Sequence, residues 1–336
     1  MTIDVDLPLI WAGVIAFGVF MYVLMDGFDL GVGIIFPFAR DEGHRDIMMN
    51  SVAPIWDGNE TWLVLGGTGL LAAFPIAYAT ILPALYLPVL LMLIALIFRG
   101  VAFEFRFKTE RHRAIWSWSF HLGSLLATFS QGIILGAFIT GFEVVGRDYV
   151  GGVMDWLTPF GIAIGIGMVA GYMLLGSTWI VMKTEGSLQA WAFRIARIAL
   201  FAVLFFIALV SIWTPLAHED IAARWFSWPN IVYLSPVPIL TGLVAVGLYL
   251  ALERRREALP FILSLGIFAL SYAGLAISLW PNVVPPDITI WDAAADEKSL
   301  IFLLVGVAIV VPIILLYTAY SYYVFRGKVR ADEGYH

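Results

Sequence analysis

The sequence predicts an all-α membrane protein that crosses the bilayer about nine times. First, 61% of its 336 residues are hydrophobic and the mean hydropathy is +0.90, whereas a soluble domain is only about half apolar. Second, apolar runs of about 20 residues, the length that crosses a bilayer core, recur from end to end. Third, loops rich in lysine and arginine alternate with loops that are poor in them, which is typical of multi-span proteins.

The apolar runs are expected to be helices, because each is too long and too uniformly apolar for a strand of a membrane barrel. The first run is long for a bilayer, and Gly27, Gly31 and Gly33 make its end hard to place. No repeat or linker divides the chain, so residues 1–336 are expected to form a single integral membrane domain. The expected spans are residues 8–36, 51–73, 80–101, 117–140, 158–182, 194–214, 231–251, 260–280 and 300–325.

The charged loops predict the orientation. Of the 19 lysines and arginines, all but Arg147, Arg224 and Lys298 fall in segments that face inward if the N-terminus lies outside. Because inward-facing loops are enriched in these residues, the N-terminus is expected outside and the C-terminus inside. This arrangement requires an odd number of spans, in agreement with nine.

The composition excludes several function classes. A net charge of −6 without a basic stripe excludes a nucleic-acid partner, and the absence of cysteine excludes thiolate metal sites and cysteine nucleophiles. Only His121 lies near a span, where a structural role is the more common one, and no two histidines have the spacing of a paired haem or metal site. The chain alone is therefore expected to ligate no haem or metal. The histidines are His44, His112, His121, His218 and His336.

Two pairs of acids lie near the ends of the first two spans. Asp26 and Asp29 occur in "MDGFDLGVG", and Asp57 and Glu60 occur in "PIWDGNETWLVLGG". Residues three apart project from one face of a helix. With the N-terminus outside, all four acids are expected in the inner half of the membrane, level with Arg99 at the inner end of the third span.

These acids allow three interpretations, because an ionised carboxylate at membrane depth is costly unless it is paired, protonated or hydrated. They could form an ion-paired inner rim that fixes helix packing, or a polar path that carries protons from the inner side to a buried site. Four acids facing one arginine favour the path. Alternatively, they could bind the coupling ion of a secondary transporter. That reading predicts inverted repeats and polar groups near the membrane midplane, and the sequence shows neither.

Three stretches carry a family resemblance. "MDGFDLGVG" at 25–33, "PIWDGNETWLVLGG" at 54–67 and "FRGVAFEFRFK" at 98–108 resemble subunit II of the bacterial cytochrome bd quinol oxidases, and the resemblance covers essentially the whole chain. The length and the tail "YSYYVFRGKV" at 320–329 resemble the cyanide-insensitive branch. The resemblance implies two four-helix bundles plus a peripheral helix.

The resemblance also implies a function within a complex of the bacterial cytoplasmic (inner) membrane, with the N-terminus periplasmic and the C-terminus cytoplasmic. Such a complex oxidises quinol and reduces dioxygen to water. Its subunit I carries the catalytic haems, two of b type and one of d type (or b type). Subunit II binds no haem through its own side chains, stabilises subunit I and lines a route for protons or oxygen. Some members hold a quinone or lipid in this subunit, and a small single-helix accessory subunit is a further expected partner.

Residue by residue, the resemblance assigns Asp57 as a proton-path carboxylate, flanked by Trp56 and Trp62. Trp62 matches a residue near an oxygen route in some members. Glu60 stands where other members carry glutamine. No catalytic residue, cofactor ligand or metal ligand is expected in this chain. The expected proton path or polar cluster comprises Asp26, Asp29, Asp57, Glu60, Arg99 and Glu104.

Overall fold

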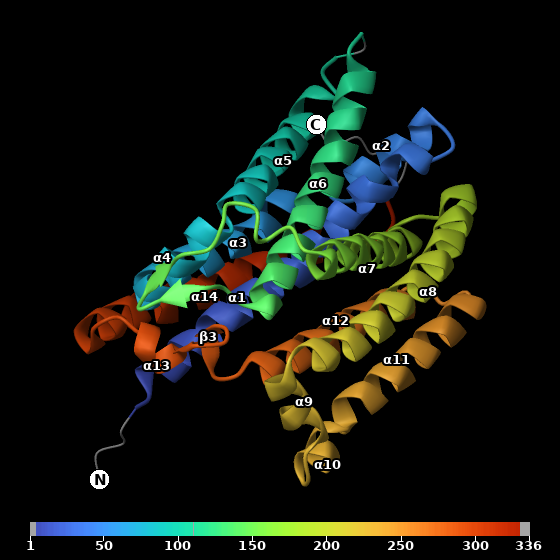
Figure 1. Ribbon diagram of the computed structural model, residues 1–336. Coiled ribbons are helices and arrows are strands. Elements are labelled where there is room, and N and C mark those ends of the chain that lie inside the picture. Colours follow the sequence, from blue (N-terminus) through green and yellow to red (C-terminus); the bar gives the residue numbers. More distant parts are fainter. Residues whose placement is uncertain (1–4, 110, 330–336) are drawn as a thin grey trace.

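The computed structural model describes residues 5–109 and 111–329, most of which are helical (Figure 1). Within this part of the chain, eight helices are long and apolar enough to cross a membrane, and a bent pair raises the number to nine if it counts as one span. The prediction of an all-α multi-span protein is confirmed. The eight helices are α1 (Leu7–Ile35), α5 (Tyr86–Phe105), α6 (Arg113–Thr140), α7 (Pro159–Lys183), α8 (Gly186–Ala217), α11 (Pro236–Glu253), α12 (Leu259–Leu279) and α14 (Glu297–Val324).

The second span is broken. The chain changes direction by 120° between helix α3 (Trp56–Ala73) and helix α4 (Pro75–Ala84). Phe74 joins them with a non-helical backbone (φ −130°, ψ 63°), because the residue before a proline is disfavoured in the helical region. The expected boundaries were wrong here: 51–73 begins before the helix does, and 80–101 runs across the junction of α4 and α5. Uniform hydropathy conceals both breaks.

The long helices form two groups of four, as expected. Helices α1, α3, α5 and α6 pack together, and α7, α8, α11 and α12 form the second group (Figure 1). Helix α7 joins the groups because it packs on both α1 and α6. Helix α14 lies at the periphery and contacts α1 and α3. Most of its large apolar side chains are exposed.

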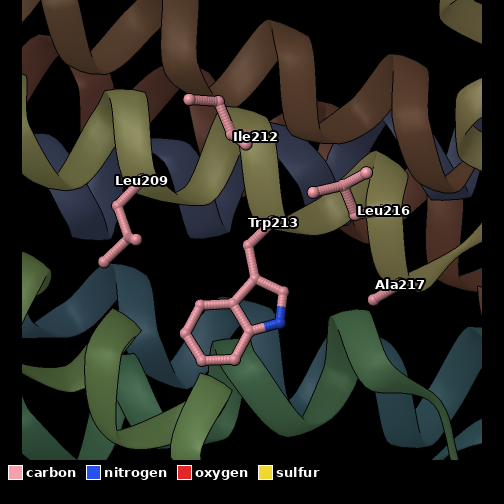
Figure 2. Close-up of a pocket in the computed structure, with 5 residues that line it drawn as sticks. All are labelled: Leu209, Ile212, Trp213, Leu216 and Ala217. Atoms are coloured by element: carbon pink, nitrogen blue, oxygen red, sulfur yellow. The ribbon is translucent and has the colours of Figure 1, made fainter.

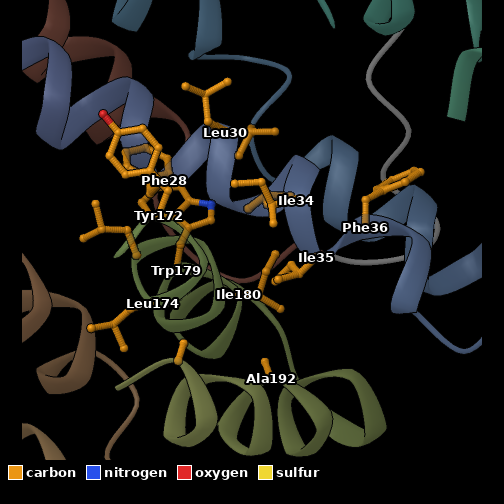
Figure 3. Close-up of a cluster of buried hydrophobic side chains, with 14 of the residues drawn as sticks. Phe28, Leu30, Ile34, Ile35, Phe36, Tyr172, Leu174, Trp179, Ile180 and Ala192 are labelled. Carbon is orange, nitrogen blue, oxygen red and sulfur yellow. The ribbon is translucent and has the colours of Figure 1, made fainter. Parts of the chain in front are cut away.

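Helices α1 and α7 cross with their backbones in contact. A Cβ atom added to Gly31 would lie 1.8 Å from the carbonyl oxygen of Tyr172, and one added to Gly176 would lie 2.3 Å from the carbonyl carbon of Gly31. Glycine is therefore required at both positions. On the same crossing, Phe28 of α1 stacks on Trp179 of α7 with ring centroids 4.2 Å apart (Figure 3). This rigid contact fixes the face of α1 that carries the acids.

The short elements gather at the two ends of the helices. One end holds η1 (Phe36–Phe38) and α2 (Glu42–Asn50), together with the α5–α6, α7–α8 and α11–α12 connections. We call it the basic end, because most lysines and arginines lie there. The opposite end holds the remaining elements. These are β1 (Val144–Val145), β2 (Asp148–Tyr149), α9 (Glu219–Phe226), α10 (Asn230–Leu234), β3 (Asn282–Val284), β4 (Ile288–Thr289) and α13 (Ile290–Ala293).

Candidate functional site

Arg99 is the centre of the candidate site. Its guanidinium is fully buried, and its Nη1 atom lies 3.2 Å from Oδ1 of Asp26. Its Nη2 atom lies 4.0 Å from Oδ2 of Asp29, and Nη1 also pairs with Oε1 of Glu60. Arg99 is six residues from the end of α5, or about 9 Å along the helix at 1.5 Å per residue. We call Asp26, Asp29, Glu60 and Arg99 the acid cluster.

Three helices build the acid cluster. Asp26 and Asp29 lie one turn apart on the face of α1 that packs towards α5 and α3, and both are fully buried. Glu60 lies in the second turn of α3 and is the one acid of the cluster that reaches the surface, with 23% of its side chain exposed. One guanidinium faces three carboxyl groups. The cluster is therefore electrically neutral only when two of the carboxyls carry a proton, and a net charge buried at this depth is costly.

Asn59 and Tyr322 extend the cluster towards α14. The amide nitrogen of Asn59 donates to Oδ2 of Asp29 at 2.6 Å, and the hydroxyl of Tyr322 donates to Oδ1 of Asn59 at 3.0 Å. Sequence reasoning missed both residues. Asn59 lies inside the quoted "WDGNE" stretch, next to Glu60, and its amide is buried in an apolar helix. Its position in the sequence could therefore have indicated that it belongs to the site. Tyr322 lies in the quoted tail "YSYYVFRGKV", but no local pattern indicates its contact with Asn59, which joins segments 263 residues apart.

A second polar chain lies on the other side of the acids. Gln131 of α6 donates from its amide nitrogen to the hydroxyl of Tyr22 at 2.8 Å, and it accepts from the hydroxyl of Tyr172 at 2.8 Å. Tyr22 precedes Asp26 by four residues on α1, so the two side chains share one face of that helix. A glutamine in the middle of an apolar span needs hydrogen-bond partners. The sequence position of Gln131 could therefore have indicated a polar site inside the membrane domain.

Two aromatic rings face the Arg99 guanidinium. Trp56 stacks on Phe103 with a centroid distance of 4.8 Å and an interplanar angle of 7°. The central carbon of the guanidinium lies 5.8 Å from the Trp56 centroid and 5.6 Å from the Phe103 centroid. Both distances are within the range of cation–π attraction. Trp62, the other expected aromatic, is buried one to two turns further along α3, with its ring edge-on to Phe17 at 5.7 Å.

Two expected members lie outside the acid cluster. Asp57 is exposed in the first turn of α3 and makes no ion pair among the described residues. Glu104 is exposed and pairs with Lys108 at 2.7 Å. Of the expected polar set, Asp57 and Glu104 therefore make no contact with Arg99. Glu104 follows Arg99 by five residues, which at 3.6 residues per turn places it about 140° around the helix.

The histidines are not arranged as a haem or metal site in the described part of the chain. No group of three or more histidine, aspartate or glutamate side chains has the geometry of a metal site there. The ring of buried His121 has its Nδ1 atom 3.2 Å from the carbonyl oxygen of Gly33, and His44 bonds to Ser187 on the surface. His336 lies outside the described residues.

An apolar pocket of about 370 Å³ lies along the surface of α8 (Figure 2). It contains no titratable group, and Trp213 points its indole ring into the pocket (Figure 2). Such a lining suits a hydrocarbon chain and not a proton or an ion. The lining residues are Leu209, Ile212, Trp213, Leu216 and Ala217.

Comparisons with known proteins agree with this architecture. A sequence model of the family described as "Cytochrome bd terminal oxidase subunit II" matches residues 7–325. "Cytochrome bd-I ubiquinol oxidase subunit 2" of Escherichia coli K12 is 30% identical over 370 residues, which cover 97% of this chain and 96% of that protein. "Cytochrome bd ubiquinol oxidase subunit 2" of Bacillus subtilis 168 is 29% identical over 342 residues, which cover 98% and 97%.

A solved structure, that of "bd oxidase from Geobacillus thermodenitrificans", contains a chain with the same fold. It matches with a TM-score of 0.74 at 20% identity and covers 95% of this chain and 97% of that one. The expected resemblance is confirmed over nearly the whole length of the sequence, and the transporter alternative is not favoured. The chain belongs to the family of cytochrome bd terminal oxidase subunit II.

Proposed function

We propose that this subunit works beside a haem-bearing subunit I, which oxidises quinol and reduces dioxygen to water with two b-type haems and one d-type (or b-type) haem. In this proposal the acid cluster of Asp26, Asp29, Glu60 and Arg99 holds and passes protons taken up from the inner side. The complex lies in the bacterial inner membrane, with the N-terminus of this chain periplasmic and its C-terminus cytoplasmic. The subunit also stabilises subunit I.

One observation carries the proposal: three carboxyl groups share a single buried guanidinium. A cluster that served only to hold the helices together would need one carboxylate, or two, for one arginine. The extra carboxyl groups give the cluster the capacity to bind and release protons without leaving a large net charge in the membrane. Reduction of dioxygen to water consumes protons, so a site of this kind has a use in the complex.

The exposure of the acids suggests an order for the path. Asp57 lies at the surface at the start of α3, and Glu60 lies one turn further in with part of its side chain exposed. Asp26 and Asp29 are buried behind Glu60. A proton would therefore pass from Asp57 to Glu60 and then to the α1 acids. This order makes Asp57 an entrance residue, and it gives Glu104, which faces away, no place in the path.

The basic end supports the proposed orientation. It holds Arg106 and Arg113 beside α2, and Lys183 and Lys328 where the C-terminal residues meet the α7–α8 connection. Arginine and lysine at one end of a multi-span protein indicate the cytoplasmic side. We further propose that the apolar pocket on α8 accommodates a quinone tail or a lipid chain. An accessory single-helix subunit would pack on the exposed apolar surface.

The test is Asp29→Asn in the assembled complex. This change keeps the shape of the side chain and its contact with Asn59, and it removes one titratable group. We expect normal haem content per complex and a loss of oxygen consumption of about tenfold or more, as for other removed proton-transfer groups. Glu104→Gln is the matched control, because it removes an exposed acid from the same region. Loss of haem from the Asp29→Asn complex would favour the packing interpretation, and full turnover would contradict the proposal.

A further inference from the structure

A small enclosed cavity lies at the basic end, where α14 meets α7 and the residues before α3. Its volume is about 20 Å³, and one water molecule needs about 10–15 Å³ by the same measure. Serine, lysine, tyrosine and tryptophan side chains line it together with isoleucine and phenylalanine. It is therefore of a size and polarity for a single water. The lining residues are Ser51, Ile55, Trp179, Lys183, Tyr322 and Phe325.

The polar groups in this cavity have spare hydrogen-bonding capacity. Trp179 is buried, and its indole N–H has no acceptor. Lys183 is also buried, and its Nζ donates one bond to the carbonyl oxygen of Phe325 at 2.6 Å. Ser51 donates to the carbonyl oxygen of Met48 at 2.7 Å and keeps its lone pairs available. A water here would accept from Trp179 or Lys183 and donate to Ser51 or Tyr322, which meets the usual requirement of two to four polar partners.

Tyr322 connects the cavity to the acid cluster. Its hydroxyl donates to Asn59, and the amide of Asn59 donates to Asp29. A carboxamide does not exchange protons as readily as a hydroxyl or a water does, so the chain is suited to orient the carboxyl of Asp29 and not to conduct protons. Tyr322 is itself held by its ring, which packs edge-on against Phe28 and Trp179 with centroids 6.5 Å and 6.3 Å away.

The C-terminal residues after α14 are bound to the α7–α8 connection beside the cavity. The backbone N–H of Val329 donates to the carbonyl oxygen of Lys183 at 2.8 Å, and Nζ of Lys328 donates to the carbonyl oxygen of Thr184 at 2.9 Å. Lys328 also pairs with Glu257 at 2.9 Å. These contacts fix the end of α14 on the α7–α8 connection and hold the Tyr322 hydroxyl at a set distance from Asn59.

We propose that Tyr322 is a positioning residue of the acid cluster, that it acts on Asp29 through Asn59, and that the cavity beneath it binds one water that completes the hydrogen-bonded chain. The proton role of Asp29 is taken from the proposed function, whereas the positioning of its carboxyl by Tyr322 is a separate claim. The charged or titratable groups that face Asp29 are Asp26 on its own helix, Glu60 on α3, Arg99 on α5 and Tyr322 on α14.

The first test is Tyr322→Phe in the assembled complex, with oxygen consumption measured across pH and expressed per haem. We expect a loss of about threefold to tenfold, the size of one hydrogen bond between neutral groups such as that from Tyr322 to the Asn59 amide, together with a displaced pH profile. Tyr323→Phe is the matched control, because the neighbouring ring is exposed and makes no hydrogen bond to the acid cluster among the described residues. A Tyr322→Phe complex with the rate per haem and the pH profile of the wild type would overturn the proposal, whatever its yield.

The double variant Asp29→Asn/Tyr322→Phe separates this claim from the proposed function. If Tyr322 acts through Asp29, adding Tyr322→Phe to Asp29→Asn changes the remaining rate no further, because coupled residues are not additive. Additive losses would show that Tyr322 acts elsewhere and would overturn the inference even if Asp29→Asn alone behaves as proposed. If Asp29→Asn alone has full turnover, the proposed function fails, and an effect of Tyr322→Phe could not then run through Asp29.

The water is tested by Trp179→Phe, which keeps an aromatic ring on Phe28 and removes the unpartnered N–H. We expect a change in the same direction as Tyr322→Phe but smaller, since one of several partners of the water is lost. A Trp179→Phe complex that matches the wild type in rate and pH profile would remove the water from the proposal.

Discussion

Arg99 and Arg106 are seven residues apart, and both bind carboxylates, but the two groups of charges differ. Arg99 lies inside α5 and faces Asp26, Asp29 and Glu60. Arg106 lies just after α5 and binds Glu42 at 2.9 Å, and the two guanidinium groups of Arg106 and Arg113 share Asp46 and Glu42.

The two groups differ in charge balance and in contact with water. Around Arg106, three arginines (Arg45, Arg106 and Arg113) face two acids, and both acids are partly exposed. Burial lowers the pKa of Arg106, and the hydrogen bond and charge of Asp46 oppose that shift. Around Arg99, the acids outnumber the arginine and two of them are fully buried. We expect the hydrated Arg106 group, in which every acid has an arginine, to fix helix ends, and the buried Arg99 group, in which acids are in excess, to exchange protons as proposed.

The largest effect is expected from Arg99→Leu. Removing the guanidinium leaves the buried Asp26 and Asp29 and the partly exposed Glu60 without a counter-charge, and breaking a buried ion pair from one side costs about 3–5 kcal/mol. We expect little assembled complex, measured as haem co-purified with a tagged chain. Arg99→Lys restores the charge and should recover part of the yield. A fully assembled Arg99→Leu complex would show that the cluster does not need its arginine.

Arg106→Gln should be milder. The side chain is buried, but its acids are partly exposed and can turn to Arg113 or to water, so we expect a loss of about 1.5–3 kcal/mol, as for one hydrogen-bonded charge. The measurement is the midpoint of thermal unfolding of the complex, together with turnover per haem. Stability should fall while turnover stays unchanged. A fall in turnover per haem at normal stability would place Arg106 in the proton path and remove the contrast with Arg99.

Substitutions of single acids test whether the Arg99 and Arg106 groups differ in their effect on turnover. Glu60→Gln should lower turnover by about tenfold or more, because it removes the acid that connects the surface to the buried pair. Asp57→Asn should lower it less, because water can replace an exposed entrance residue. Asp46→Asn, in the Arg106 group, should leave turnover unchanged. Oxygen consumption per haem ranks the three variants, and an Asp46→Asn effect as large as that of Glu60→Gln would contradict the distinction.

The smallest effect concerns the exposed pair of Lys328 and Glu257. Hydrogen bonds from Lys328 and Gln189 lower the pKa of Glu257. A carboxylate with a lowered pKa stabilises its contact at pH above its ordinary value of 4.5, and this contribution is lost as the pH falls through the lowered folded value. We therefore expect the protection of the Val329 amide, its exchange rate relative to an unstructured chain at the same pH, to fall as the pH drops through the lowered pKa of Glu257 in the wild type. In Glu257→Gln the protection should be low across the same pH range, and protection that still falls with pH as in the wild type would contradict the assignment.

Much of the fold could be predicted from the sequence, because a bilayer fixes the length and polarity of each helix. The break at Phe74 could not be read from hydropathy, although Pro75 marks it. In the site, the three-residue spacing of Asp26 and Asp29 was enough to place both on one face. Glu104 lies about 140° around α5 from Arg99, which the five-residue spacing indicates, but the family resemblance grouped the two residues together. Tyr322 depends on where α14 packs, which no local pattern encodes.

The most direct measurement is infrared spectroscopy of the assembled complex near neutral pH, in the region of the protonated carboxyl C=O stretch. If the acid cluster holds protons, the wild type shows bands that exchange in heavy water, and Asp29→Asn and Glu60→Gln each remove part of that intensity. Asp46→Asn removes none. A wild-type spectrum in which neither cluster variant changes a protonated carboxyl band would mean that all three acids are ionised around Arg99, and it would contradict a proton-holding cluster.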